Sequence, residues 1–101
     1  MRFKSILRRH ERLRKAICRK IQRTVKAESR ITGNPQRVFL RRAVPLDHPA
    51  LTSNRQVIAI GISYQRGLSA EVHNNREDRN YILPLRVIPT DVLIKILAKL
   101  S

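Results

Sequence analysis

The chain has no tryptophan, a single cysteine and few acidic residues. Its 101 residues include 7 Asp and Glu against 22 Lys and Arg, and only two Phe and two Tyr. The lone Cys18 cannot form a disulfide within the chain, which is typical of a reducing compartment. No stretch approaches the roughly 18 apolar residues of a transmembrane segment. We therefore expect a small protein of the cytoplasm, or one packaged within a particle.

Glycine-rich loops and clustered metal ligands are also missing from the sequence. The three glycines, Gly33, Gly61 and Gly67, lie far apart, which excludes a phosphate-binding glycine loop. The histidines and the single cysteine have no spacing typical of a zinc site. We therefore predict that the protein binds no metal and no cofactor.

One group of polar residues invites a comparison with nucleases. Glu71, His73, Glu77 and Asp78 gather near the end of a predicted hairpin that precedes a helix, an order also found in ββα-metal nucleases. That layout needs a His or Asn later in the helix, where this chain offers only Asp91 at the helix start. Polar residues on the solvent side of a hairpin explain the group more simply. We therefore predict no catalytic residue and no enzymatic activity.

What the chain has in excess is positive charge, and this charge is concentrated at one end. Residues 1–30 hold twelve Lys and Arg against two acids, and residues 1–42 hold fifteen against the same two. The other fifty-nine residues hold seven bases and five acids. An Arg-rich start with few acids is also found in mitochondrial targeting segments. Charge concentrated this strongly indicates a polyanionic partner.

Residues 3–28 have the periodicity of one long amphipathic helix. At 100° per residue, the apolar side chains from Phe3 to Val25 fall within a stripe about 120° wide. Arg14 alone breaks the pattern and lies at the edge of the stripe. The glycine and proline of residues 33–35 predict the end of the helix.

The side of this helix opposite the apolar stripe is the candidate binding surface. Arginine outnumbers lysine eight to four in residues 1–30. The planar guanidinium group binds phosphate oxygens in pairs and stacks on bases, which favours nucleic acid over a lipid headgroup. The predicted phosphate contacts are Arg8, Arg9, Arg12, Lys15, Arg19, Lys20, Arg23 and Lys26, with Arg41 and Arg42 in support.

The remaining residues predict a small α+β body (34–101) after a basic helical arm (1–33). Extended segments are expected at 37–44, 57–64, 68–73 and 81–88, with a loop at 45–54 and a tight turn at Gly67. In 57–64 large and small side chains alternate, which predicts one face covered by a helix. Pro84 has no backbone donor, so its strand is expected at a sheet edge. The predicted fold class is α+β, with a long basic N-terminal helix, an antiparallel meander of three to four strands and a short C-terminal helix.

The end of the chain predicts a capped helix. Thr90, which follows Pro89, is the expected N-cap, and Asp91 is placed to interact with the helix dipole. The segment Tyr81–Leu100 resembles the C-terminal module of short uncharacterised proteins from Bacteroidetes bacteria and their phages, in which a hairpin leads into a helix capped by Leu-Pro-Thr-Asp-x-Leu. The resemblance covers about a fifth of the chain. It implies the hairpin and the helix, and it implies no activity.

Three functions fit a basic amphipathic helix followed by a small α+β body. The first is a non-enzymatic accessory protein that contacts the backbone of DNA or RNA, in a ribonucleoprotein, a phage particle or a mobile-element complex. The second is a structural or assembly protein whose basic helix docks on an acidic protein surface. The third is a peripheral membrane protein, although the stripe offers a single aromatic anchor, Phe3. The α+β body is expected to bind a protein partner or a second copy of the chain.

Overall fold

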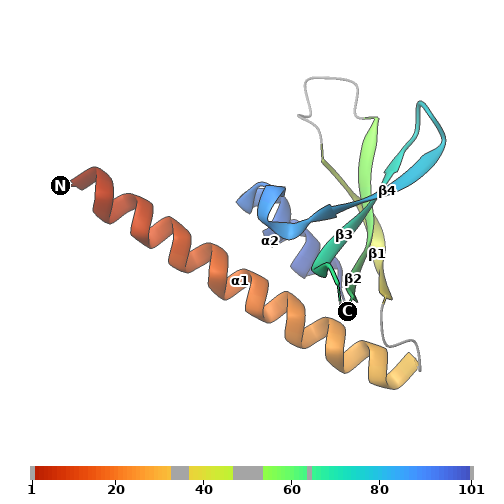
Figure 1. Cartoon of the computed structure of the whole chain (residues 1–101), viewed down its shortest axis with the longest axis horizontal. Coiled ribbons are helices and arrows are strands. Elements are labelled where there is room, and N and C mark those ends of the chain that lie inside the picture. Colours follow the sequence, from red (N-terminus) through yellow and green to blue (C-terminus); the bar gives the residue numbers. More distant parts are fainter. Residues whose placement is uncertain (1, 33–36, 47–53, 64, 101) are drawn as a thin grey trace.

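A long helix, a four-stranded antiparallel sheet and a short helix follow one another in the computed structural model (Figure 1). The structure describes residues 2–32, 37–46, 54–63 and 65–100. The elements are α1 (Arg2–Thr32), β1 (Arg37–Pro45), β2 (Arg55–Ser63), β3 (Gly67–Asn74), β4 (Arg79–Pro84), the 3-10 turn η1 (Leu85–Val87) and α2 (Thr90–Lys99). Because the strands pair in the order β1-β2-β3-β4, the predicted α+β class with a meander is confirmed.

A few sequence predictions concern positions that the structure does not describe. The helix stop at 33–35, Tyr64 in the second predicted strand and residues 47–53 of the predicted loop all lie outside the described residues. The described part of α1 ends at Thr32, next to the predicted stop.

The last predicted strand is shorter than expected at its C-terminal end. The prediction was 81–88, whereas β4 ends at Pro84 and the chain turns into η1. Pro84 cannot donate a ladder hydrogen bond, and β4 lies at the edge of the sheet, as predicted. The turn before β3 also has the predicted chemistry, because Gly67 has a φ of 66°.

One hydrophobic core joins the sheet to both helices. Its fully buried side chains include Ile21 and Val25 of α1, Ile60 of β2, and Leu93 and Ile96 of α2. The second half of α1 is therefore part of the core. Only the first half of the helix projects beyond the body, and the one break in the apolar stripe, Arg14, lies between the exposed Leu13 and the buried Ile17.

A bulge in β2 changes which of its residues face the helices. Val57 pairs with Val72 of β3, and Ala59 pairs with the next residue of β3, so Ile58 has no partner in this ladder. An extra residue of this kind interrupts the alternation of a strand. As a result Val57, predicted to lie on the small-residue face, is buried in the core together with Ile60. The prediction of strict alternation along 57–64 was wrong at this point.

The start of α2 differs from the prediction in its cap. Pro89 is the N-cap residue, and its carbonyl accepts a hydrogen bond from the amide of Leu93 at 3.0 Å. Thr90 is the first helical residue, and its hydroxyl makes no capping hydrogen bond. Asp91 lies in the first turn, as expected. The Thr90 hydroxyl is free to contact α1 instead.

Candidate nucleic-acid interface

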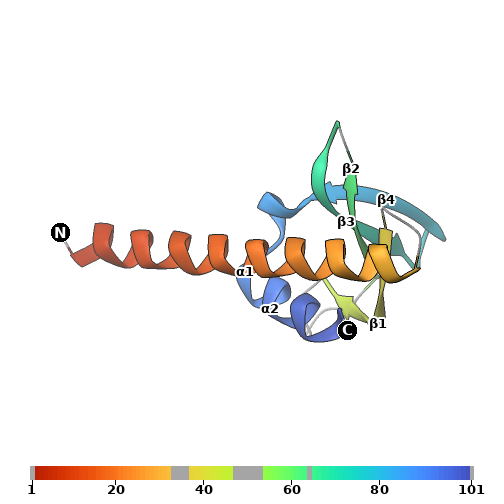
Figure 2. The same cartoon turned by 90° about the horizontal axis from the view of Figure 1, so that it is seen from below.

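The first half of α1 projects from the body (Figures 1 and 2). Every side chain from Lys4 to Leu13 is exposed, whereas the apolar stripe is buried from Ile17 onward. We call residues 4–13 the projecting half of α1. Its apolar side leaves Ile6 61% and Leu7 46% exposed. A partner can therefore reach most of the projecting half, except where His10 lies against Thr90 at the start of α2.

The eight predicted phosphate contacts of α1 form one cationic face. All eight side chains are exposed, and the helical repeat places them opposite the buried Ile17, Ile21 and Val25. Within the described part of the chain, no ion pair involves seven of them, namely Arg8, Arg9, Arg12, Lys15, Arg19, Lys20 and Arg23. Their charge is therefore available to an external anion.

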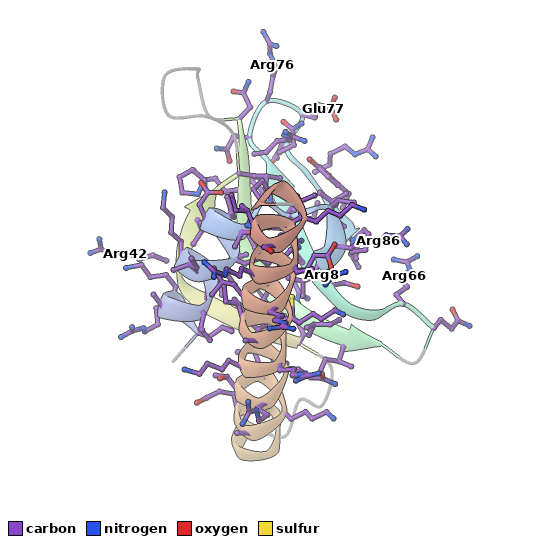
Figure 3. All side chains as sticks on the ribbon, turned by 90° about the vertical axis from the view of Figure 1, so that its left-hand side faces the viewer. Arg8, Arg42, Arg66, Arg76, Glu77 and Arg86 are labelled. Atoms are coloured by element: carbon purple, nitrogen blue, oxygen red, sulfur yellow. The ribbon has the colours of Figure 1, made fainter. Side chains whose placement is uncertain are left out.

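The two predicted supporting arginines lie away from this cationic face. Arg41 of β1 donates a hydrogen bond from Nη2 to the carbonyl oxygen of Ala98 at 3.2 Å. This carbonyl belongs to the last turn of α2, where a cation interacts favourably with the helix dipole. Arg42 is exposed and points to the side of the molecule opposite Arg66 and Arg86 (Figure 3). The structure thus does not bring Arg41 and Arg42 together with the cations of α1.

Arg14, the residue that interrupts the amphipathic pattern, attaches the middle of α1 to the body. Its Nη2 atom donates to the carbonyl oxygens of Leu85 at 2.8 Å and Arg86 at 3.0 Å, and its Nη1 atom donates to the Thr90 hydroxyl at 3.2 Å. The Nε2 atom of His10 lies 3.1 Å from the same hydroxyl. Sequence reasoning left Arg14 out of the site, yet its place beside the apolar stripe was the signal that it has a partner on the body.

Replacing Arg14 by methionine should destabilise the fold. The variant keeps a long apolar side chain but removes the hydrogen bonds to two carbonyls, and hydrogen bonds to a charged group contribute about 1.5–3 kcal/mol. We expect the free energy of unfolding in urea to fall by a similar amount. The matched change Arg12→Met, at an exposed position of the same helix, should alter it by less than about 0.5 kcal/mol. Equal effects at the two positions would contradict the role given to Arg14.

The polar residues of the β3–β4 hairpin contact one another. Glu71 accepts hydrogen bonds from Arg37 of β1 and from Nδ2 of Asn80, the latter at 3.2 Å. His73 contacts the side-chain oxygen of Asn80 through one ring nitrogen and lies 3.5 Å from a carboxylate oxygen of Asp78 through the other. Among the residues that the structure describes, no group of three or more His, Cys, Asp or Glu is placed to hold a metal ion. These contacts are typical of polar side chains on the solvent side of a hairpin.

No protein-family model, curated protein or solved structure matches this chain. No helix in the described ranges is both long enough and apolar enough to cross a membrane. What the protein binds has to be inferred from its own surface, and the cationic face of α1 is the feature that distinguishes this surface.

Proposed function

We propose that this protein is a non-enzymatic accessory protein that binds the backbone of nucleic acid through α1. The observation that carries the proposal is the projecting half of α1, where exposed arginines have no acidic partner in the described chain. Such an arrangement weakens the free helix, because each like-charged pair at i and i+4 costs roughly 0.2–0.5 kcal/mol. Bound phosphate groups would neutralise these cations and remove the repulsion. Solubility alone does not require so many cations without acidic partners on one helix.

The dimensions of α1 suit a polyanion with regularly spaced charges. The 31 residues of α1 have a length of about 46 Å at 1.5 Å per residue. Duplex DNA carries one phosphate per roughly 1.7 Å of its axis, so several phosphates can lie along such a helix. Contacts to phosphates position a protein without reading the sequence. Any sequence preference would come from arginine bound to guanine or from the shape of the nucleic acid.

The body would anchor the bound nucleic acid to a protein partner or to a second copy of the chain. Phe39 of β1 and Ile94 of α2 are large apolar side chains that the body leaves exposed, which supports a contact of this kind. A ribonucleoprotein, a phage particle and a mobile-element complex are all compatible settings, in the cytoplasm or within a particle.

A second candidate is an assembly protein whose α1 docks on an acidic protein surface. The observation in its favour is the apolar side of the projecting half, since phosphates would not cover Ile6, Leu7 and Leu13. A protein surface with an apolar centre and acidic edges would cover both these side chains and the flanking arginines.

The salt dependence of affinity tests the proposed function. Fluorescence anisotropy would measure binding to a labelled duplex of about 20 base pairs, which is longer than α1 at 3.4 Å per base pair. If about six phosphates are neutralised, log K should fall with log salt at a slope near −5. An affinity that does not depend on salt would contradict phosphate binding and would favour the apolar protein contact.

A further inference from the structure

Both helices pack on one side of the four-stranded sheet (Figure 1). Val38, Ile60 and Ala70, which are paired across β1, β2 and β3, lie in the core with side chains of α1 and α2. Because side chains alternate along a strand, the neighbouring row of paired residues points away from the helices. This row consists of Phe39, Ala59, Glu71 and Ile82, one from each strand in the order β1 to β4. We call this side the open face of the sheet, and no helix of the described residues covers it.

Two large apolar side chains are exposed on the open face. Phe39 is 58% exposed and Ile82 is 47% exposed. The guanidinium carbon of Arg37 lies 4.4 Å from the centre of the Phe39 ring, and the same guanidinium group donates a hydrogen bond to Glu71. Ala59 is fully buried although it lies outside the hydrophobic core, so the side chains around it pack closely. The ring of Phe39 is therefore held in place before a partner binds, which lowers the entropic cost of binding.

The open face carries little net charge, on a chain with a formal net charge of +15. The cation of Arg37 is paired with the carboxylate of Glu71. The residues that follow Arg37 across the sheet, Gly61, Ser69 and Pro84, are uncharged. A nucleic-acid backbone or an acidic protein therefore gains little here, and the carboxylate repels both. Two copies of the chain, by contrast, can meet at this face without the repulsion that their cationic faces exert on each other.

We propose that the open face is the contact between two copies of this chain. Two stacked sheets pack about 10 Å apart with their strands roughly aligned. A two-fold axis that runs along the strands, between β2 and β3, places β1 of each copy over β4 of the other. Phe39 of each copy then lies against Ile82 of the other, so one pair of side chains forms two equal contacts.

A shallow depression beside β4 provides room for the ring of Phe39. Its volume is about 610 Å³, and its lining includes Ser69 and Ile82 of the open face. The same two-fold axis places Phe39 of the other copy over this depression. Arg66 and Arg86 also line it, and a guanidinium group interacts favourably with the face of an aromatic ring. The open face thus carries both a protruding aromatic side chain and the depression that receives it, as a contact between identical copies requires.

The size of the open face indicates a dimer of moderate stability. Four strands about 4.8 Å apart give it a width of about 19 Å, and the six residues of β4 give it a length of about 20 Å. A contact of this outline lies at the lower end of the interfaces found between soluble proteins. We therefore expect a dissociation constant in the micromolar range.

A dimer formed in this way presents two copies of α1. Since α1 packs on the side of each sheet opposite the open face, the two helices lie on opposite outer surfaces of the dimer. The cationic face of each helix remains exposed. The dimer can therefore bridge two nucleic-acid segments. This consequence rests on the proposed function, whereas the association of two copies does not depend on it.

Sedimentation velocity of the native protein and of Phe39→Thr, both freed of nucleic acid, tests the proposal. Threonine keeps the strand preference and removes the ring, so the fold should tolerate the change at this exposed position. Because the two-fold axis removes the ring twice, we expect the dissociation constant to rise on the order of 30-fold. The matched control is Val87→Thr, which replaces an apolar side chain of similar exposure (55%) on η1 and should leave the dimer unchanged.

Salt provides a second measurement, with an expected sign opposite to that of phosphate binding. The contact has little net charge while the rest of each copy is strongly basic, so screening should strengthen the dimer between about 0.1 and 0.5 M salt. A native protein that remains monomeric at high micromolar concentration in the higher salt would overturn the proposal. A dimer that Phe39→Thr leaves intact, or one that weakens as salt is added, would overturn it as well.

Capture of a fluorescent duplex by a second, immobilised duplex measures bridging. The native protein and Val87→Thr should link the two duplexes, whereas Phe39→Thr should bind each duplex and link them poorly. A stable dimer that binds no duplex would support this proposal and contradict the proposed function, and a monomer that binds the duplex would do the reverse. A monomer whose affinity for oligo-dT falls in Phe39→Thr would show instead that the open face stacks on bases, and the proposal would be wrong.

Discussion

The double variant Arg12→Glu/Arg19→Glu is expected to bind nucleic acid on the order of 100-fold more weakly than the native protein at physiological salt. Loss of two phosphate contacts alone accounts for roughly 30-fold, and the two new carboxylates repel the backbone further. Both arginines are exposed on the cationic face of α1 and take part in no ion pair of the described residues. Stability should not fall, because the two introduced carboxylates would relieve like-charge repulsion at i and i+4.

The comparison protein for this variant is Arg76→Glu/Lys95→Glu, which lowers the net charge by the same amount on the hairpin and on α2. Long-range attraction depends on net charge, so both double variants lose some of it. Only the α1 variant should also show a flatter dependence of log K on log salt, because only its contacts to phosphate are removed. Anisotropy titrations at several salt concentrations, with urea unfolding to verify the fold, measure both quantities. Equal losses in the two proteins would mean that α1 is not the binding surface.

The sequence predicted the elements of this fold because each one depends on local periodicity. The 3.6-residue repeat of α1 and the alternation of the strands, apart from the bulge in β2, follow from spacing. The turn at Gly67 and the edge position of Pro84 follow from the backbone chemistry of these two residue types. The same repeat also placed the candidate cations on one exposed side of α1. The apolar stripe, however, continues from Phe3 to Val25 with a single break at Arg14, and periodicity could not show that its burial begins only at Ile17.

What the sequence could not predict depends on contacts between distant residues. Arg14 meets Leu85 and Thr90 across more than seventy positions, and no local pattern specifies that pairing. Arg66 and Arg86 belong to separate segments with little surplus charge, and only the fold makes them line one depression. The prediction that Thr90 caps α2 was wrong for a related reason, because the Thr90 hydroxyl contacts side chains of α1 rather than the backbone of its own helix.

Replacing Ile21 by alanine should lower the free energy of unfolding by about 2–4 kcal/mol. Ile21 is 0% exposed and lies in the core with side chains of the sheet and of α2. The change removes buried methyl and methylene groups and leaves a cavity that a well-packed core fills only in part. In a domain of this size such a loss is a large share of the total stability.

Ile6→Ala is the matched control, since Ile6 has the same side chain on the same stripe of the same helix but lies in the projecting half, 61% exposed. Its effect should stay within about 0.5 kcal/mol, because little area is buried there and alanine favours the helix. Urea unfolding followed by far-UV circular dichroism compares the two proteins directly. A large difference means that the body buries the apolar stripe at Ile21 and leaves it exposed at Ile6. Small and equal effects would mean instead that all of α1 is an arm, divided from the body near residue 33.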